Sequence, residues 1–172
     1  MIAAMRWIAV AALVFCSSAQ GATVISPESG TSRPYQRWVN RARVPTPPIA
    51  VTVIGEPCPT GLGRSCTSPD GPIYIAPSEL HPRHAFYHEL GHKFDYTVMT
   101  DDGRAAFEAL QGDARPWRSS PNSPHEQFAE GYSICAAQKV PHLPGYVAYG
   151  YWRGLREHRA VCRLIRAVQQ DH

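Results

Sequence analysis

The sequence lacks a strong net charge, a long apolar run and any internal repeat, and each absence excludes a class of protein. Its 17 basic and 14 acidic residues give a net charge of only +3. The arginines are also scattered, which argues against a nucleic-acid partner. The apolar run at residues 7–15 is too short for a membrane span of about 20 residues, so we expect no stable membrane anchor. A chain of 172 residues suits a single domain.

The N-terminus has the layout of a secretory signal peptide. One positive residue precedes the apolar run, and small residues follow it. Cleavage after Ala19 or Gly21 would leave a mature chain of about 150 residues, long enough to bury a core. Cys16 could instead mark a lipoprotein, although the bulky Phe15 stands where such sites carry a small residue. We assign residues 1–21 to a cleaved signal peptide and expect a secreted or periplasmic protein.

Four cysteines remain in the mature chain, and none belongs to a CxxC pair. An even number of cysteines in an exported protein suggests disulfide bonds. Of the possible pairings we favour Cys58–Cys66, which closes a loop rich in proline and glycine, and Cys135–Cys162, which would join two helices. The short loop should contribute roughly 2–3 kcal/mol of stability. A cysteine-ligated metal is the competing interpretation, and the spacings disfavour it.

The residue pattern predicts an α+β domain over residues 49–172. An extended segment, 22–48, precedes it and contains a short helix at 34–42. Two β-branched runs predict strands, and prolines at both ends of the second run favour a sheet edge. Apolar periodicity and helix-start signals predict four later helices. The expected elements are strands at 49–55 and 71–77 and helices at 78–99, 101–112, 123–138 and 151–170.

The sequence HELGH at residues 88–92 fits the HExxH pattern. On a helix, His88 and His92 share one face about 6 Å apart along the axis, so both imidazoles can bind one Zn²⁺. Glu89 is turned by about 100° and can reach a water on the metal without binding the metal. Zinc lowers the pKa of such a water to about 7, and Glu89 can take its proton. Ordinary surface histidines are the alternative, but this helix also has a separate apolar face.

A third ligand is needed, because catalytic zinc uses three protein ligands and one open position. His84 shares the histidine face but lies about 12 Å from His92 along the axis, too far to bind the same ion. A metzincin would continue as HExxHxxGxxH, whereas this chain has Asp95 and Val98 at the last two positions. The third ligand must come from elsewhere, and the segment HEQFAE, 125–130, offers two glutamates on one helical face.

HELGHKFDY followed by EQFAE resembles the gluzincin metallopeptidases. The resemblance, over roughly residues 72–138, is to the branch that contains the anthrax lethal factor catalytic domain and the Pro-Pro endopeptidases. It implies a zincin-like fold, in which a small sheet with an edge strand packs on the HExxH helix. It also implies Glu126 as the third zinc ligand and Glu130 as the residue that orients a ligand histidine. Asp95 could orient His92 likewise. Glu126 could instead be a capping-box glutamate without a metal. Glu130 and Asp95 could be ordinary charged residues on the surface.

One feature of that branch is missing from the chain. The branch places a tyrosine about two helical turns before the third ligand to stabilise the oxyanion, and a lost oxyanion donor can cost about a hundredfold in rate. The aromatic segment 144–152 could border a cleft or be an ordinary surface loop. Four other side chains could replace the missing tyrosine: Tyr96, Arg118, His125 and Tyr132.

We therefore expect an exported, monomeric zinc endopeptidase with Glu89 as general base and a peptide or protein as substrate. The segment IYIA, 73–76, would hold that substrate as an added strand. A non-catalytic zinc-binding module that binds a peptide or protein partner in the same groove is the second interpretation. An exported toxin or effector that uses the same chemistry on a host protein is the third.

Overall fold

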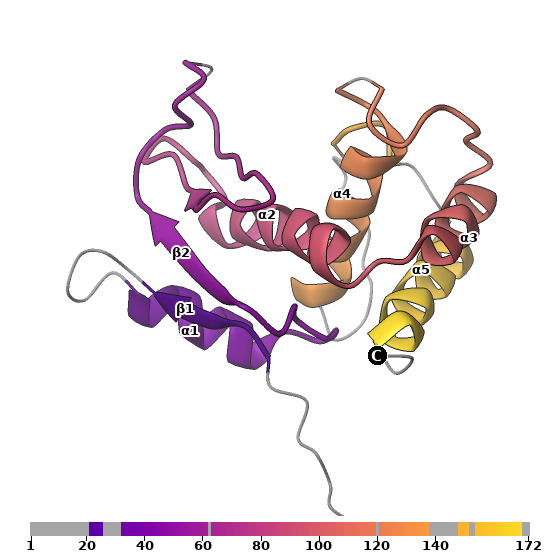
Figure 1. Cartoon of the computed structure of the whole chain (residues 1–172), viewed down its shortest axis with the longest axis horizontal. Helices are drawn as coiled ribbons and strands as arrows, with labels where there is room; N and C mark the ends of the chain where they lie inside the picture. The colour runs from indigo at the N-terminus through magenta and orange to yellow at the C-terminus, as the bar shows by residue number, and fades with distance from the viewer. Residues whose placement is uncertain are drawn as a thin grey trace, which may run out of the picture.

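The computed structural model describes residues 21–25, 32–61, 63–119, 121–137, 148–151 and 154–169, so nearly all of the expected signal peptide lies outside it. Within these residues, helices combine with a small sheet (Figure 1), in agreement with the expected α+β class. No helix among them is both long and apolar enough to cross a membrane. The elements are β1 (Thr23–Ile25), α1 (Ser32–Arg41), β2 (Ala50–Ile54), β3 (Ile73–Tyr74), α2 (Pro82–Thr97), α3 (Asp101–Gln111), α4 (Pro124–Ala137) and α5 (Leu155–Val168).

The sheet has one strand more than the sequence predicts. Its strands lie parallel in the order β1-β2-β3. The segment 22–48, expected to be extended with a short helix, supplies both β1 and α1, and α1 packs beside β1 (Figure 1). Val24 and Val39 from this segment belong to the main hydrophobic core. The segment therefore forms part of the same core as the rest of the described chain.

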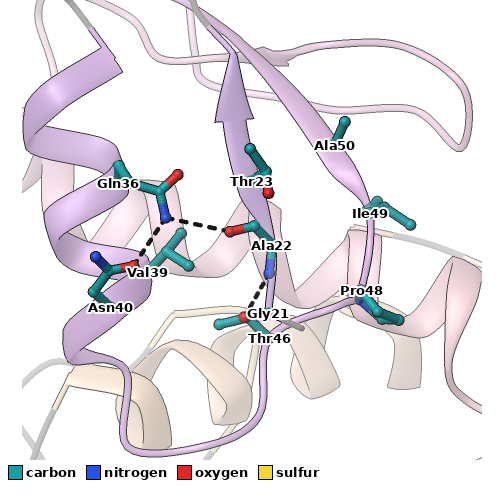
Figure 2. A pocket seen from close by; sticks show the side chains of 10 residues that line it. All are labelled: Gly21, Ala22, Thr23, Gln36, Val39, Asn40, Thr46, Pro48, Ile49 and Ala50. Atoms are coloured by element: carbon teal, nitrogen blue, oxygen red, sulfur yellow. Dashed lines mark hydrogen bonds between the residues drawn. The ribbon is translucent and has the colours of Figure 1, made fainter. Parts of the chain in front are cut away.

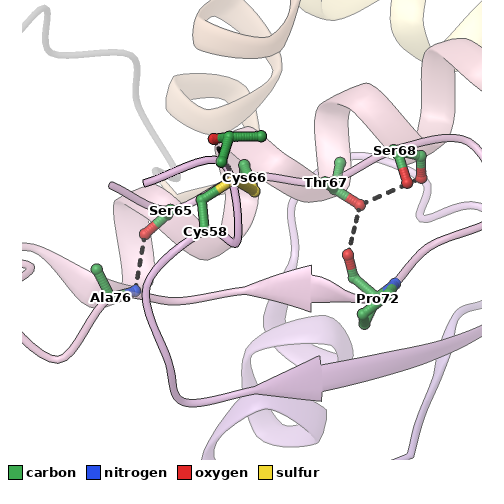
Figure 3. The surroundings of a disulfide bond; sticks show 8 residues. Cys58, Ser65, Cys66, Thr67, Ser68, Pro72 and Ala76 are labelled. Carbon is green, nitrogen blue, oxygen red and sulfur yellow. Dashed lines mark hydrogen bonds between the residues drawn. A yellow bond between two sulfur atoms is a disulfide. The ribbon is translucent and has the colours of Figure 1, made fainter. Parts of the chain in front are cut away.

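The outer side of β3 is covered by the end of the Cys58–Cys66 loop (Figure 3). The Tyr74 N–H donates to the Cys66 carbonyl at 2.8 Å, and the Cys66 N–H donates to the Tyr74 carbonyl at 3.1 Å. The hydroxyls of Ser65 and Thr67 bond the backbone on either side of β3, at 3.2 and 3.0 Å. β3 is the last strand in the order β1-β2-β3, as the prolines around it predict. Residues 65–67 already bond to its outer side, so the expectation that IYIA would pair directly with a substrate is wrong.

Both expected disulfide bonds are confirmed. Cys58 and Cys66 have Cα atoms 5.5 Å apart, and the Cα atoms of Cys135 and Cys162 are 5.6 Å apart. The second bond joins α4 to α5, as the sequence predicts. Disulfides of this kind persist in oxidising compartments, which is compatible with export.

Helix α2 is central and packs extensively against α4 (Figure 1). Proline at its start suits a first helical turn, and every residue from 86 to 95 is buried. The two helices approach closely at Gly91, where an added Cβ would lie 3.0 Å from both Ala129 Cα and Tyr132 Cβ. This contact holds α4, one to two turns beyond Glu126, against α2.

Candidate metal centre

Three polar side chains from α2 and α4 converge at this helix contact. Glu126 Oε2 lies 3.2 Å from His88 Nε2 and 3.4 Å from His92 Nε2. All three donor atoms lie within 4.8 Å of one another. The histidines come from consecutive turns of α2, and Glu126 comes from the first turn of α4. These residues form a group that could hold a metal ion.

The distances from Glu126 to the two histidines fit tetrahedral coordination. Ligands about 2.0–2.1 Å from a tetrahedral zinc ion lie about 3.3–3.4 Å from one another, close to the 3.2 and 3.4 Å found here. His88 and His92 are only 4 % and 5 % exposed, whereas the Glu126 side chain is 25 % exposed. The group thus has a buried histidine side and a side that opens to solvent.

Glu130 lies behind His88, as expected for a residue that orients a ligand. Its Oε2 is 3.4 Å from His88 Nδ1 and 3.0 Å from His84 Nε2. Its Oε1 accepts a hydrogen bond from the backbone N–H of Ala148 at 3.3 Å. His84 itself is 38 % exposed at its side chain, so it lies at the rim of the group, where the helical spacing puts it.

Asp95 contacts His125 instead of His92. Its carboxylate is completely buried and bonds Arg104 Nε at 2.8 Å, His125 Nδ1 at 3.0 Å and Trp117 Nε1 at 3.1 Å. His92 Nδ1 is buried without a hydrogen-bond partner in the part of the chain that the structure describes. The expected Asp95–His92 contact is therefore replaced by an indirect one, in which Asp95 holds the His125 ring 4.2 Å from the His92 ring.

Glu89 is a nearly buried carboxylate whose pKa is raised above its ordinary value. It is 5 % exposed, and no described residue hydrogen-bonds to its carboxylate. Burial raises the pKa of Glu89 to about 7; the charge of His88 opposes this rise, and the carboxylates of Glu126 and Glu79 add to it. A carboxylate with a pKa near neutrality can both accept and donate a proton at physiological pH.

The two histidines differ in their protonation. Burial lowers the pKa of His92 to about 4, so its imidazole is neutral at pH 7. Burial acts on His88 in the same direction, but its contacts with the carboxylates of Glu126 and Glu130 outweigh it and raise the pKa of His88 to about 10. Because a metal needs the neutral imidazole, metal binding at neutral pH would displace a proton from His88.

The side chains considered as oxyanion donors occupy different places. Tyr132 is completely buried, and its hydroxyl donates to the Pro45 carbonyl at 2.8 Å, so it does not serve the site. Arg118 stacks over the Tyr96 ring at 4.9 Å. The Tyr96 hydroxyl lies 3.3 Å from His125 Nε2. Tyr96 and His125 therefore stay near His92 but already bond to one another.

A further aromatic residue, Tyr149, borders the group on the other side. Its ring stacks on His88 with centroids 4.6 Å apart and planes 26° apart. Burial, followed by the charges of Glu126 and Glu89, raises the pKa of Tyr149 to about 12. The sequence gives only a weak sign of this position, a Tyr-Gly pair typical of a turn, inside the aromatic segment 144–152.

A second group with metal-binding residue types has a structural explanation. Cys135, Cys162 and His158 lie together in the core, but the two sulfur atoms form a disulfide and so cannot act as thiolate ligands. His158 is completely buried, with Nδ1 2.6 Å from the Tyr151 hydroxyl. Burial lowers the pKa of His158 to about 4, which keeps it neutral.

A pocket of about 780 Å³ lies between β1 and α1 (Figure 2) and shares no residue with the candidate metal centre. Two of its polar side chains, Gln36 and Thr46, are paired with the backbone of β1 and the residue before it. Gln36 donates to the Ala22 carbonyl at 3.3 Å and accepts from the Val24 N–H at 2.7 Å. Thr46 Oγ1 accepts from the Ala22 N–H at 2.9 Å. These bonds hold β1 in place and leave the pocket without an ionisable group.

Comparisons of the chain with models of protein families, with curated proteins and with solved structures found no match. The chemistry of the site is therefore inferred from its own residues and distances.

Proposed function

We propose that the protein is an exported zinc-dependent endopeptidase. The observation that supports the proposal is the convergence of His88, His92 and Glu126, whose donor atoms lie within 4.8 Å of one another and whose glutamate lies 3.2 and 3.4 Å from the two histidines. Two histidines and a glutamate with a side open to solvent are a donor set used by catalytic zinc. Glu89, the residue after the first histidine, is a nearly buried carboxylate beside this set, and no described residue hydrogen-bonds to it.

The residues around the donor set supply the remaining parts of a hydrolytic reaction. When bound, zinc would act as a Lewis acid on a carbonyl group and make a water molecule more acidic. Glu89 accepts the proton of the attacking water and passes it to the leaving amine. The Glu130 carboxylate lies 3.4 Å from Nδ1 of His88, while Nε2 faces Glu126 and the ion that this group would hold.

A peptide substrate is favoured by the resemblance of HELGHKFDY and EQFAE to the gluzincins. Because residues 65–67 cover the edge of β3, an extended peptide would pair with the outer side of this segment. In an antiparallel pair the residues that flank a hydrogen-bonded position direct their backbone groups outward. Ser65 and Thr67 flank Cys66 in this way, and they offer the N–H and C=O groups that strand addition requires.

A non-catalytic zinc-binding module is the second candidate. It is favoured by the absence of a tyrosine in the segment before Glu126. Replacement of Glu89 by glutamine separates the two candidates, because an enzyme should lose peptide hydrolysis and keep its zinc, whereas a binding module should lose neither zinc nor partner.

The first experiment measures the metal content of the purified mature protein by elemental analysis. We expect about one zinc ion per chain for the wild type and a clear loss for Glu126→Ala. Glu157→Ala, which removes an exposed carboxylate from α5, is the matched control and should keep the metal. A wild-type protein that binds no zinc, even when zinc is supplied, would contradict the proposed function.

A further inference from the structure

Tyr149 lies in a turn whose backbone is costly for a residue with a side chain. Its φ is 57° and that of Gly150 is 70°, so both central residues are left-handed. The Tyr151 N–H donates to the Ala148 carbonyl at 3.1 Å, which closes a turn of the I′ pattern. Glycine, asparagine and aspartate are the usual residues in such turns. A tyrosine held in this conformation beside a cluster of charged groups points to a functional constraint.

Helix α4 fixes this turn on both sides of Tyr149. On one side, the Ala148 N–H donates to Glu130 at 3.3 Å. On the other, Tyr151 is completely buried and lies so close to Gly131 that an added Cβ would be 3.0 Å from its ring. The helix that carries Glu126 therefore also holds Tyr149 in place against His88.

The Tyr149 hydroxyl is an unused donor among the described residues. Its surroundings include the carboxylates of Glu126, Glu89 and Glu130, whose charges act on the phenol. His125, the alternative on the other side of the site, has both ring nitrogens engaged, Nδ1 with Asp95 and Nε2 with the Tyr96 hydroxyl. Among the described residues, the Tyr149 hydroxyl is thus a donor beside the two histidines that has no hydrogen-bond partner and can bind a substrate.

We propose that Tyr149 is a catalytic residue whose hydroxyl donates a hydrogen bond to the carbonyl oxygen of the scissile peptide bond. The inference rests on the proposed peptidase function. Water adds to the carbonyl carbon, the C–N bond breaks, and Glu89 carries the proton from the water to the amine. Tyr149 keeps its own proton throughout and stabilises the negative charge that develops on the oxygen. Tyr149 would thereby stabilise the oxyanion, for which the segment before Glu126 supplies no tyrosine.

The test compares Tyr149→Phe with the wild type in the mature zinc-loaded protein, on a peptide library and then on the best single peptide. The phenylalanine ring can still stack on His88, so zinc affinity should stay within about twofold. Loss of the donor should lower kcat by about a hundredfold or more, with KM nearly unchanged. Tyr35→Phe is the matched control. It removes a hydroxyl from α1, which carries none of the residues of the candidate metal centre, and it should retain full activity.

A binding measurement provides a readout independent of turnover. A phosphinic peptide built on the best substrate carries a charged oxygen where the scissile carbonyl would be, and Tyr149→Phe should bind it about a hundredfold more weakly. The cleaved peptide product should bind both proteins equally. A variant with wild-type kcat and wild-type phosphinic affinity would overturn this inference alone. A variant that loses its zinc would also overturn it, because Tyr149 would then hold the metal site and not the substrate. A wild-type protein without zinc or hydrolysis would overturn the proposed function, and this inference with it.

Discussion

Replacement of Gly91 by alanine tests whether the close approach of α2 and α4 holds the candidate metal centre together. The new Cβ would lie 3.0 Å from Ala129 Cα and from Tyr132 Cβ, and 3.2 Å from the Ala129 carbonyl oxygen. Non-bonded carbon atoms are most stable about 3.5–4.0 Å apart, so the helices would have to separate by about half an ångström or more. Two of the three atoms belong to the backbone of α4, so rotation of a side chain cannot relieve the contact.

Two effects on stability oppose one another in this variant. Alanine in place of glycine inside a helix gains about 1 kcal/mol, whereas overpacking of a core costs about 1–3 kcal/mol. The net loss of unfolding free energy should therefore be only about 0–2 kcal/mol. Zinc affinity should respond more strongly, because Glu126 lies one helical turn before Ala129 and moves with it. Changes to residues that support a ligand typically weaken metal binding by about 10–100-fold, and we expect a loss in this range.

The assay combines zinc competition against a chelator with urea unfolding of the metal-free protein. Gly103→Ala in α3 is the control. An added Cβ there would meet only the ends of side chains, the nearest being Val168 Cγ2 at 3.3 Å, so this variant should gain up to about 1 kcal/mol and keep its zinc affinity. If Gly91→Ala bound zinc as tightly as the wild type and gained stability like Gly103→Ala, the reasoning from the helix contact would be refuted.

Two further predictions concern buried ionisable groups away from the donor atoms. Asp95→Asn should lower the free energy of unfolding in urea by about 3 kcal/mol at pH 7, because it removes the charge that pairs with buried donors. Asp101→Asn is the control: Asp101 forms an exposed ion pair with the same arginine, Arg104, so its loss should change stability little. Equal effects of the two variants would contradict the prediction. Burial opposes the ionisation of Asp95, but its bonds to His125 and Arg104 hold its pKa well below the usual range, so the stability it confers should be lost as pH falls below about 4. Burial lowers the pKa of His158 to about 4, below the value of about 6.5 in an unfolded chain, so the unfolded state takes up the proton first as pH falls. His158 should thereby contribute a decrease in stability of about 1.4 kcal/mol per pH unit between about pH 6.5 and 4. The slopes of the wild type and of His158→Gln should differ by this amount, and a variant with the wild-type slope would show that the proton binds elsewhere.

Elements with a local signal could be predicted from the sequence. The helix with HELGH was expected at 78–99 and extends over Pro82–Thr97. Its spacing of four residues already implied a shared face for the two histidines. The helix with Glu126 was expected at 123–138 and extends over Pro124–Ala137. The disulfides followed from the even cysteine count and from the separation along the chain. In the helices and in the Cys58–Cys66 loop the decisive interactions connect residues that are close in sequence, whereas Cys135 and Cys162 are 27 residues apart and followed from the cysteine count and the expected helices.

Features that depend on distant contacts could not be predicted. Strand β1 has three residues, too few to show a period of two, and its partner β2 begins at Ala50. The loop segment at Cys66 resembles any turn-rich linker, and nothing local shows that it bonds to the edge of β3. Asp95 lies three residues from His92, close enough on a helix for either to face the other. Its actual partners come from α3 and α4 and from the loop between these helices.

Helix α4 connects the stability of the fold to the chemistry of the site. It carries Glu126 in the donor set, Glu130 behind His88, and the surface at Gly131 on which the turn of Tyr149 rests. One turn further, Cys135 joins the same helix to α5. A shift of α4 along α2 by even half an ångström would change the distances between donor atoms, the support of the ligand and the position of the proposed oxyanion donor together. A zinc site is sensitive to changes in ligand distance of about 0.2 Å. Substitutions that weaken contacts of α4 at positions remote from the metal should therefore lower zinc affinity and catalytic rate as well as the stability of the fold.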